Sequence, residues 1–177
     1  MVAADQGWGI GRAGAIPWPK LRGDMQHFKR VTSATSDPAR QNAVIMGRKT
    51  WDSAEVAGKA LPRRLNIVVS RSADLVLPDG VVLAGSLDQA LGAAGAAETT
   101  FVVGGAVLYR EAFDHPELRW IYLTRVLARF ECDTHLPDLD ARGYARDETW
   151  QGACSAEDNG VAYRIERGRL PAQRAIS

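Results

Sequence analysis

Asp24, an acidic side chain among apolar neighbours, is the residue of this chain best suited to proton-transfer chemistry. It lies in the segment LRGDMQHF, and Phe28 follows four residues later, so both side chains point along one face of a predicted helix. Burial beside Phe28, Met25 and Ile16 would raise the pKa of the carboxyl and suit it to hold a polar ring edge and assist proton transfer. An acid in the first helical turn also favours the helix dipole, and from spacing alone this capping role is the favoured interpretation.

A glycine pair in the segment FVVGGAVLY is suited to contact with phosphate. A buried strand runs into Gly104 and Gly105 and then into a predicted helix. Glycine lets the backbone turn sharply and approach a ligand, and a helix N-terminus offers unpaired N–H groups to an anion. A glycine pair between strand and helix also occurs for structural reasons alone, so this segment does not decide between the two.

Cations and hydroxyl groups follow two other predicted strands. The first strand is followed by Gly47, Arg48, Lys49 and Thr50, and the second by Ser70 and Arg71. Neighbouring parallel strands bring their carboxyl ends to the same edge of a sheet, where ligands collect. Cations on two strand ends beside a glycine pair indicate a ligand with several phosphates, such as a dinucleotide with an additional 2′-phosphate. A solvated basic surface is the alternative.

The segment GIGRAG, Gly9–Gly14, matches the dinucleotide-binding pattern G-x-G-x-x-G, but its context does not. That pattern requires a helix that begins within the motif and faces a pyrophosphate. Pro17 and Pro19 forbid such a helix. We predict instead a flexible glycine-rich loop that begins at Gly9, ends in Ile16-Pro17-Trp18 and closes over a ligand as a lid. A plain surface loop, the alternative, would not explain why two large apolar side chains, Ile16 and Trp18, are exposed together.

Other catalytic chemistries lack candidates in this sequence. His27 is one residue from Phe28 and is expected to face solvent. The fragment Asp133–His135 has no further metal ligand at a useful spacing, and no metal site is predicted. The sequence has no G-x-S-x-G motif and no Cys–His pair, so nucleophilic catalysis is not expected either.

Short apolar runs and helical segments alternate along the first two thirds of the chain. Continuously apolar runs are typical of strands buried on both faces of a parallel sheet, and they cover residues 2–4, 43–46, 65–69, 81–84 and 101–103. Helices are predicted over residues 22–34, 48–55, 86–94 and 106–113. This alternation indicates an α/β fold. Longer strands at 121–130 and 161–170, with a third candidate at 149–152, are expected to pair antiparallel at one side of the sheet.

Length and composition exclude several classes of protein. The chain has 177 residues with a net charge of +1, which suits one globular domain and disfavours a general nucleic-acid binder. We expect a domain over residues 1–170 and a C-terminal tail over 171–177. Two cysteines, no signal peptide and no apolar run long enough for a membrane span favour the reducing cytoplasm.

Seven segments, taken in order, resemble the motifs of the dihydrofolate reductase family. They cover about residues 2–169 and read GWGIG…IPWPKLRGDMQHFKR, VIMGRKTWDS, LPRRLNIVVSR, FVVGGAVLYREAF, YLTRV, FECDTHLPD and YRIERGR. The resemblance implies a single-domain α/β fold with a mixed, mostly parallel eight-stranded sheet flanked by about four helices. It also implies an oxidoreductase of one-carbon metabolism. Such an enzyme transfers hydride from NADPH to carbon 6 of 7,8-dihydrofolate and delivers a proton to nitrogen 5, forming 5,6,7,8-tetrahydrofolate.

The resemblance assigns substrate roles to residues at matching positions. Asp24 would hold the pterin amino group and ring N–H and help to protonate the substrate through water near Trp18, with Thr124 in the same hydrogen-bond network. Arg64 would pair with the carboxylate of the glutamate tail, since its planar fork suits two oxygens. Asp24, Trp18 and Thr124 form the implied catalytic set. The implied substrate-binding set is Ala3, Ile16, Asp24, Met25, Phe28, Arg64, Val103 and Thr124.

The resemblance places the cofactor along the glycine-containing strand ends. Cations and hydroxyl groups would hold the adenosine phosphates, the glycine pair would meet the diphosphate, and Ala3 and Tyr109 would border the nicotinamide. The implied set is Ala3, Ile10, Gly47, Arg48, Lys49, Thr50, Ser70, Arg71, Val103, Gly104, Gly105, Ala106, Val107, Leu108 and Tyr109.

Three positions depart from the family pattern. The chain begins at Met1-Val2-Ala3, so a backbone carbonyl expected near the pterin would belong to Met1. Arg63 replaces the usual glycine before Arg64 and places a second guanidinium near the tail carboxylates. Ala84-Gly85 stands where many relatives carry a cation, so selection of the 2′-phosphate would rest on Arg48, Lys49 and Arg71.

Two alternatives to dihydrofolate reduction remain. A pyrimidine reductase of the riboflavin pathway shares the fold and the Gly-Gly turn, but would not need Asp24 or Arg64. A non-catalytic NADPH- or folate-binding module is the other alternative. In each case we expect small-molecule ligands, a monomer, and neither a nucleic-acid nor a membrane partner.

Overall fold

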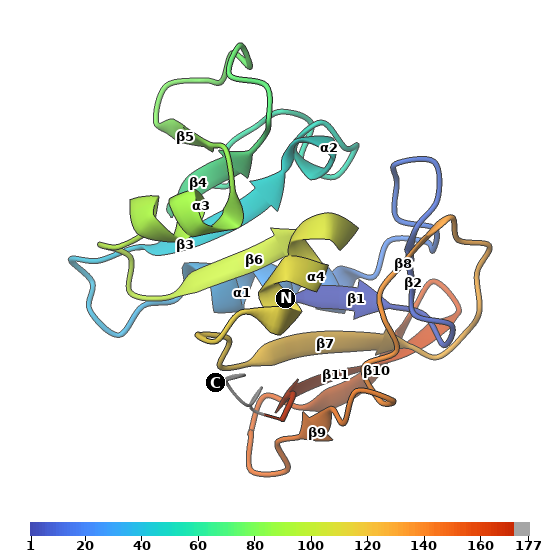
Figure 1. Ribbon diagram of the computed structural model, residues 1–177. Coiled ribbons are helices and arrows are strands. Elements are labelled where there is room, and N and C mark those ends of the chain that lie inside the picture. The colour runs from blue at the N-terminus through green and yellow to red at the C-terminus, as the bar shows by residue number, and fades with distance from the viewer. Residues whose placement is uncertain (172–177) are drawn as a thin grey trace, which may run out of the picture. The chain divides into compact units, whose positions relative to one another are not determined.

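A computed structural model describes residues 1–171 (Figure 1). The contacts between residues divide the chain into two compact units. Unit 1 consists of Met1–Met25 and the chain from Arg110 onward, and unit 2 is Gln26–Tyr109. Helices α1 (Arg22–Ser33) and α4 (Ala106–Asp114) each contribute residues to both units. Residues 172–177 of the predicted tail lie outside the described residues.

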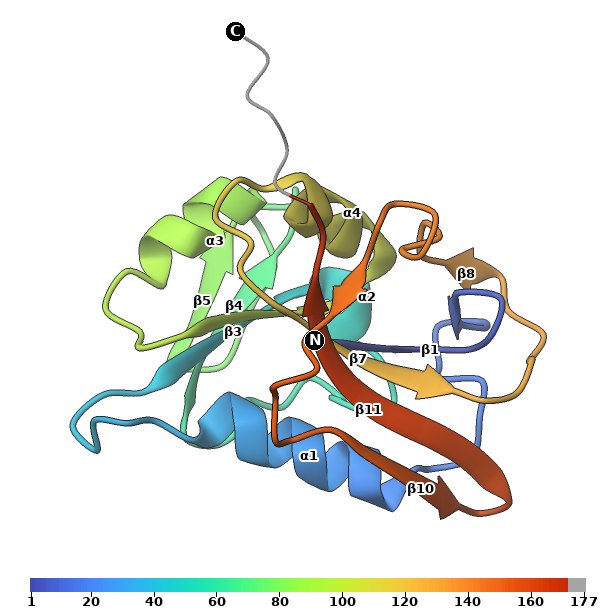
Figure 2. The same cartoon turned by 90° about the horizontal axis from the view of Figure 1, so that it is seen from below.

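Unit 1 is built on a mixed sheet with the strand order β1-β7-β11-β10, and β9 pairs with the end of β11. Strand β1 runs parallel to β7, whereas β11 is antiparallel to β7, β9 and β10 (Figure 2). The short strands β2 and β8 form a separate antiparallel pair. The strands of this unit are β1 (Val2–Ala4), β2 (Gly9–Gly11), β7 (Ile121–Val126), β8 (Thr134–His135), β9 (Ala145–Arg146), β10 (Cys154–Asp158) and β11 (Val161–Arg169).

The core of unit 1 forms where alternate residues of β7 and β11 face the start of α1. Alternation buries one side of a strand and leaves the other half-exposed, as the pattern of β11 shows. The core cluster on this side of the sheet comprises Trp18, Leu21, Val126, Val161, Tyr163 and Ile165. It fixes the segment that leads into α1 against the sheet.

Unit 2 contains an entirely parallel sheet with the strand order β5-β4-β3-β6. The central residues Val44, Ile45 and Met46 are fully buried, as expected for a continuously apolar strand in a parallel sheet that is covered on both faces. The strands are β3 (Asn42–Gly47), β4 (Arg64–Val69), β5 (Val81–Ala84) and β6 (Thr100–Gly104). The helices wholly within this unit are α2 (Arg48–Trp51) and α3 (Leu87–Ala93), and Ser86 caps α3 by accepting a hydrogen bond from the N–H of Gln89.

The predicted mixed α/β class is confirmed, with parallel pairs prevailing in unit 2 and antiparallel pairs in unit 1. The strand predicted at 149–152 is wrong. The side chain of Asp147 accepts hydrogen bonds from the N–H and hydroxyl of Thr149, which folds this segment into a turn. Helix α2 is also shorter than predicted and ends at Trp51.

No helix within residues 1–171 is both long and apolar enough to cross a membrane. Over the same residues, no group of three or more His, Cys, Asp and Glu side chains is arranged to hold a metal ion.

Candidate active site

Asp24 of unit 1 is bound to a side chain of the sheet. The Thr124 hydroxyl donates a hydrogen bond of 2.6 Å to Asp24 Oδ1. Parallel pairing of β1 with β7 sets Ala3 opposite Thr124, so the predicted residues Ala3, Thr124 and Asp24 come together. Burial raises the pKa of Asp24, and the hydrogen bond from Thr124 offsets this only in part. The carboxyl therefore keeps its proton to a higher pH than an exposed aspartate.

A different acid serves the start of helix α1. The N–H of Gly23 donates to Asp158 Oδ2 at 2.9 Å, and the hydroxyl of Tyr163 donates to the same oxygen at 2.7 Å. Space at this position is tight, because a Cβ on Gly23 would lie 2.2 Å from the Tyr163 oxygen. The helix start thus relies on Asp158, and the carboxylate of Asp24 is directed to Thr124.

The glycine-rich loop is tied to the segment that precedes β8, and no helix begins in it. The N–H of Ala13 donates to Asp133 Oδ2 at 2.7 Å, and the N–H of Asp133 donates to the Gly11 carbonyl at 3.0 Å. Residues Gly9–Gly11 form strand β2, which places the half-buried Ile10 in the β2–β8 pair. The sequence excluded a dinucleotide-binding helix here, and the structure agrees.

Trp18 is buried, contrary to the expectation that it would be exposed together with Ile16. Only 7% of Trp18 is accessible, and its ring packs edge-to-face on Phe130 with centroids 5.8 Å apart. It belongs to the core cluster of unit 1, which draws the ring away from solvent. Ile16 remains 46% exposed.

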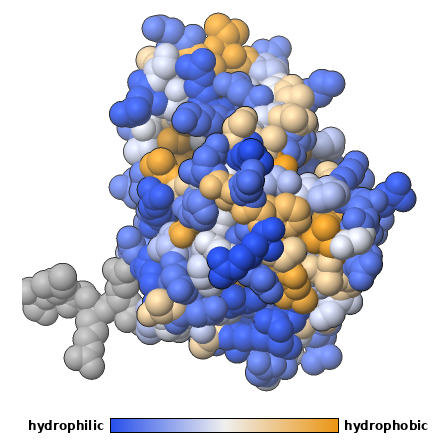
Figure 3. Space-filling model, turned by 90° about the vertical axis from the view of Figure 1, so that its right-hand side faces the viewer, coloured by the Kyte–Doolittle hydropathy of each residue, from blue (hydrophilic) through white to orange (hydrophobic). Residues whose placement is uncertain are grey.

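Exposed apolar side chains mark parts of the predicted site. The face drawn in Figure 3 shows small hydrophobic patches separated by hydrophilic side chains. Within the described residues, the exposed large hydrophobic side chains are Ile16, Met25, Val76, Val107 and Leu127. Three of these, Ile16, Met25 and Val107, were predicted from the sequence to contact substrate or cofactor. Apolar groups left in water at such positions are available to a ligand.

The guanidinium of Arg64 in unit 2 is fixed beside Phe28. Arg64 donates to the Thr32 hydroxyl at 2.7 Å and to the Pro62 carbonyl at 3.0 Å, and its guanidinium carbon lies 6.0 Å from the centroid of the Phe28 ring. Burial, with a smaller contribution from the neighbouring charge of Arg63, lowers the pKa of Arg64. Among residues 1–171 no carboxylate pairs with Arg64, and a largely buried cation of this kind suits a carboxylate ligand.

Arg63 occupies a backbone conformation that favours glycine. Its φ angle is +62°, in the left-handed region, which agrees with the expectation that glycine is usual at this position. The guanidinium donates to the Ser33 hydroxyl at 3.2 Å. The side chain is exposed next to the buried Arg64.

The strand ends of unit 2 meet at one edge, as predicted. Register pairs Gly47 of β3 with Val69 of β4, and Val69 with Ala84 of β5, so Ser70 and Arg71 follow directly after Val69. On the other side, Met46 pairs with Gly104 of β6. The exposed side chains of Arg48, Lys49 and Arg71 therefore belong to neighbouring strand ends.

Gly104 leaves no room for a side chain, and Gly105 leaves little. Gly104 has a φ of +143°, and a Cβ on it would lie 2.8 Å from the Thr50 hydroxyl oxygen. The peptide between Gly104 and Gly105 is cis. A Cβ on Gly47 would contact Leu108 and the backbone of Gly105 at 3.7–3.9 Å. These three glycines bring the backbones of two strands and the start of α4 close together.

Helix α4 exposes one of the predicted cofactor residues and buries two. Val107 is 65% exposed, whereas Leu108 and Tyr109 are largely buried in the core. Val103 and Ala106 are half-buried at the junction of β6 and α4. Leu108 and Tyr109 pack in the core beneath the turn between β6 and α4, whereas Val107 is available for direct contact with a ligand.

His27 is buried, so the expectation that it faces solvent is wrong. It is 4% exposed, and its Nδ1 lies 3.3 Å from a guanidinium nitrogen of Arg30. Burial and, to a smaller extent, the charge of Arg30 lower its pKa to about 4. Spacing could have shown this, since positions three apart on a helix share a face and His27 follows Asp24 by three.

The whole described fold is similar to that of known dihydrofolate reductases. A family model described as dihydrofolate reductase matches residues 1–168. The dihydrofolate reductase of Rattus norvegicus is 37% identical over 174 residues, which cover 94% of this chain and 93% of the relative. The solved structure of Schistosoma mansoni dihydrofolate reductase superposes with a TM-score of 0.81 at 33% identity and covers 96% of both chains.

Bifunctional plant relatives are also similar. The bifunctional dihydrofolate reductase-thymidylate synthase of Daucus carota is 40% identical over 171 residues, which cover 92% of this chain and 32% of the relative. The chain thus spans about a third of the length of these relatives. From the family model and the full-length relatives together, the chain belongs to the dihydrofolate reductase family.

Proposed function

We propose that this chain reduces 7,8-dihydrofolate to 5,6,7,8-tetrahydrofolate with NADPH as the hydride donor. Family membership supports the reaction, and one geometric observation carries the residue assignment. Asp24, a half-buried carboxyl of raised pKa, is held at 2.6 Å by Thr124. This pair combines a polar anchor for a pterin edge with a group that retains a proton near the reaction.

Asp24 binds and helps to protonate the pterin, and Thr124 orients the Asp24 carboxyl. The ionised carboxylate accepts hydrogen bonds from the amino group and ring N–H of the pterin, and the protonated carboxyl helps to supply the proton that nitrogen 5 takes up. Thr124 holds one carboxylate oxygen, which leaves the other oxygen for the substrate. Ile16 and Met25, both exposed apolar side chains, flank the carboxyl in sequence and cover the ring from water.

The strand ends of unit 2 have the chemistry that NADPH requires. The close approach of Gly47, Gly104 and Gly105 lets backbone N–H groups reach a diphosphate, because no side chain intervenes. Exposed Arg48, Lys49 and Arg71 supply positive charge for the 2′-phosphate. NADPH supplies the hydride, and these residues of the chain hold and orient it.

Arg64 is the proposed partner of the glutamate tail. Its guanidinium is already oriented by Thr32 and Pro62, so little side-chain freedom is lost when a carboxylate binds. Phe28, under the same guanidinium, offers an aromatic face to the pterin or to the aminobenzoyl group. The neighbouring Arg63 adds positive charge for the second tail carboxylate.

We propose further that residues 1–170 act as one domain and as a monomer in the cytoplasm. One chain carries candidate residues for both ligands, and both cysteines, Cys132 and Cys154, are free thiols, which suits a reducing compartment. A net charge of +1 speaks against a nucleic-acid partner.

The activity is tested by following NADPH oxidation with dihydrofolate in the wild type and in Asp24→Asn. The variant should lose about 10²–10⁴-fold in kcat/KM, the usual contribution of one well-placed acid. The matched control is Asp88→Asn, which removes an acid from the first turn of another helix, α3, and should leave the rate unchanged. Turnover of a riboflavin-pathway pyrimidine in place of dihydrofolate, or no turnover at all, would contradict the proposal. Full activity of Asp24→Asn would refute the role of Asp24 alone.

A further inference from the structure

One strand of unit 1 carries a charged network directly behind the Asp24–Thr124 pair. Arg125 follows Thr124 in β7, and successive residues of a strand point to opposite faces. Thr124 faces Asp24, so Arg125 projects from the other side of the sheet. Any shift of this strand therefore moves the partner of Asp24 and the guanidinium of Arg125 together.

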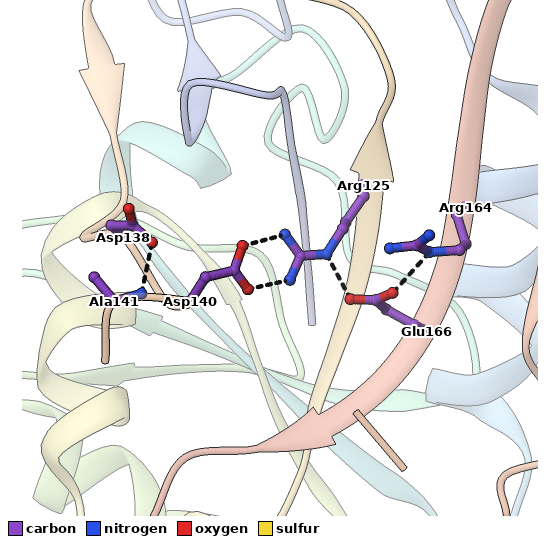
Figure 4. A network of polar contacts seen from close by, with 6 residues as sticks. All are labelled: Arg125, Asp138, Asp140, Ala141, Arg164 and Glu166. Atoms are coloured by element: carbon purple, nitrogen blue, oxygen red, sulfur yellow. Dashed lines mark hydrogen bonds and ion pairs between the residues drawn. The ribbon is translucent and has the colours of Figure 1, made fainter. Parts of the chain in front are cut away.

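Two carboxylates hold the Arg125 guanidinium in one orientation (Figure 4). Asp140 accepts from both terminal nitrogens, at 3.0 and 2.6 Å, and Glu166 accepts from Nε at 2.6 Å. Glu166 is only 1% exposed and also accepts from Arg164 at 2.9 Å. Burial alone would lower the pKa of Arg125, but the hydrogen bonds to these carboxylates outweigh it and raise the pKa. The guanidinium is thus permanently charged and fixed in its plane.

The acid that orients Arg125 is itself fixed by a local turn. Asp138 accepts a hydrogen bond from the N–H of Ala141 at 2.9 Å, which closes a turn around Asp140 (Figure 4). The N–H of Gly143 donates to the carbonyl of Asp140 at 2.9 Å. The local turn therefore positions Asp140 for its ion pair with Arg125, although the Asp140 side chain is 58% exposed.

The fixed guanidinium supports the turn that leads into the glycine-rich loop. We call residues 5–9 the Trp8 turn. The guanidinium carbon of Arg125 lies 5.0 Å from the centroid of the Trp8 ring, within the range of a cation–π contact. The carbonyl of Trp8 accepts from the N–H of Leu136 at 2.8 Å, and Gly9 pairs with His135. Residue 9 then begins the glycine-rich loop, which carries Ile16.

The Trp8 turn needs such support because its backbone is strained. Trp8 has a φ of +61°, a conformation that a bulky residue adopts only when its surroundings impose it. The Asp5 side chain stabilises the turn, since its carboxylate accepts hydrogen bonds from the N–H groups of Gly7, Gly9 and Phe130, each at 2.8 Å. A cavity of about 320 Å³ is lined by Trp8 and Gln6 together with Arg125 and Asp140, so the ring and the guanidinium that it contacts border open space and are packed only in part.

We propose that Arg125 is a positioning residue that sets the conformation of the glycine-rich loop by holding Trp8 on a guanidinium fixed by Asp140 and Glu166. The role in turnover rests on the proposed function. The role in loop conformation does not, because it concerns only residues of unit 1. Released from Asp140, the guanidinium turns away from the Trp8 ring, and the strained turn relaxes toward the adjoining cavity.

The test uses the full chain and the variant Asp140→Asn, which removes one charge and leaves the buried Glu166–Arg125 pair intact. Trypsin cleaves after Arg12 in the glycine-rich loop, and mass spectrometry identifies that cut. We expect cleavage after Arg12 to accelerate about 10-fold in Asp140→Asn, while the melting temperature stays close to that of the wild type. The matched control is Asp114→Asn, which breaks the exposed ion pair with Arg142 in the same unit and should leave cleavage at Arg12 unchanged.

A double-mutant cycle separates positioning from a general loss of structure. Trp8→Leu and Asp140→Asn touch different parts of the network, and Arg125 connects them. We expect each single variant to lower kcat/KM for dihydrofolate about 10-fold, and the double variant to lose little more than either, because both act through one contact. Arg125→Lys, which keeps the charge but loses the fork, should behave like Asp140→Asn.

Three results would overturn the proposal: unchanged cleavage after Arg12 in Asp140→Asn, equal acceleration in Asp114→Asn, or additive losses in the double variant. The cleavage measurement requires no substrate. If the chain did not reduce dihydrofolate but showed the expected cleavage pattern, the proposed function would be refuted and the positioning role of Arg125 would stand.

Discussion

At the scale of single residues, the environment of Asp24 decides its chemistry. Its helical position suits either a cap or a catalytic acid, and the hydrogen bonds distinguish the two. Asp158 serves the N–H at the start of α1, whereas Asp24 accepts from Thr124. Burial raises the pKa of Asp24, so a protonated population persists at a pH where an exposed aspartate has lost its proton.

The raised pKa of Asp24 predicts how activity depends on pH. Protonation of nitrogen 5 needs the acid form, so kcat/KM for dihydrofolate should fall as pH rises above the raised pKa, by about tenfold for each unit of pH. In Asp24→Asn this limb should be absent, because the amide does not titrate. The measurement is a profile of kcat/KM against pH for both proteins. An identical falling limb in the variant would assign the titration to another group.

At the scale of elements, the parallel register of the strands in unit 2 brings the candidate cofactor-binding residues to one edge of the sheet. Because β5, β4, β3 and β6 pair in register, their carboxyl ends lie at one edge, and each end contributes a glycine, a hydroxyl or a cation. The turn between β6 and α4 is the tightest part of this edge. Thr50 of α2 fills the space that a side chain on Gly104 would need.

Gly104→Ala should therefore damage the cofactor edge. The new Cβ would lie 2.8 Å from the Thr50 oxygen at a φ of +143°. We expect the free energy of unfolding to fall by about 1–3 kcal/mol. The affinity for NADPH should also fall, because the backbone must shift. Chemical denaturation and NADPH titration measure the two effects.

Gly92→Ala provides the matched control within the same unit. Gly92 lies in helix α3, and a Cβ there meets nothing within 4 Å. This substitution should stabilise the chain by about 0.5–1 kcal/mol and leave NADPH binding unchanged. Wild-type stability and affinity in Gly104→Ala would contradict the proposed role of the glycine pair.

At the scale of the whole molecule, buried ionisable groups couple stability to pH. His27 has a pKa of about 4 in the folded chain against 6.5 for an ordinary histidine, because burial, aided by Arg30, disfavours its charged form. The unfolded chain therefore binds this proton more readily than the folded chain between these two values. Stability supplied by neutral His27 is present above pH 6.5 and is lost as the pH falls toward 4.

The free energy of unfolding should decrease from pH 6.5 to pH 4 by up to roughly 3 kcal/mol through this group. His27→Gln cannot take up the proton, so its stability should vary less over the same range. Exposed His135→Gln is the control and should keep the wild-type dependence. Denaturant unfolding at several pH values measures these slopes, and parallel slopes for wild type and His27→Gln would refute the assignment.

Much of the fold and part of the candidate site were predictable from sequence. Continuous apolar runs marked all four strands of the parallel sheet of unit 2, because a strand covered on both faces has no alternation between apolar and polar residues. Pro17 and Pro19 excluded a helix after the glycine motif, because proline lacks an N–H and restricts the residue before it. The short β2–β8 pair was not predicted, since two or three residues contain no periodicity.

The sequence by itself determined the order of motifs, the α/β class and the chemistry of the strand ends, because these depend on local residue types and spacing. Only the tertiary structure decided which partners the side chains take. In the folded chain Trp18 and His27 are buried, and Asp158 accepts the hydrogen bond from the N–H of Gly23 at the start of α1. Arg125, the residue after Thr124, pairs with Asp140 and Glu166. The N–H of Gly23 and its acceptor Asp158 are 135 positions apart. Spacing along a strand or helix defines a face, but packing alone decides what that face meets.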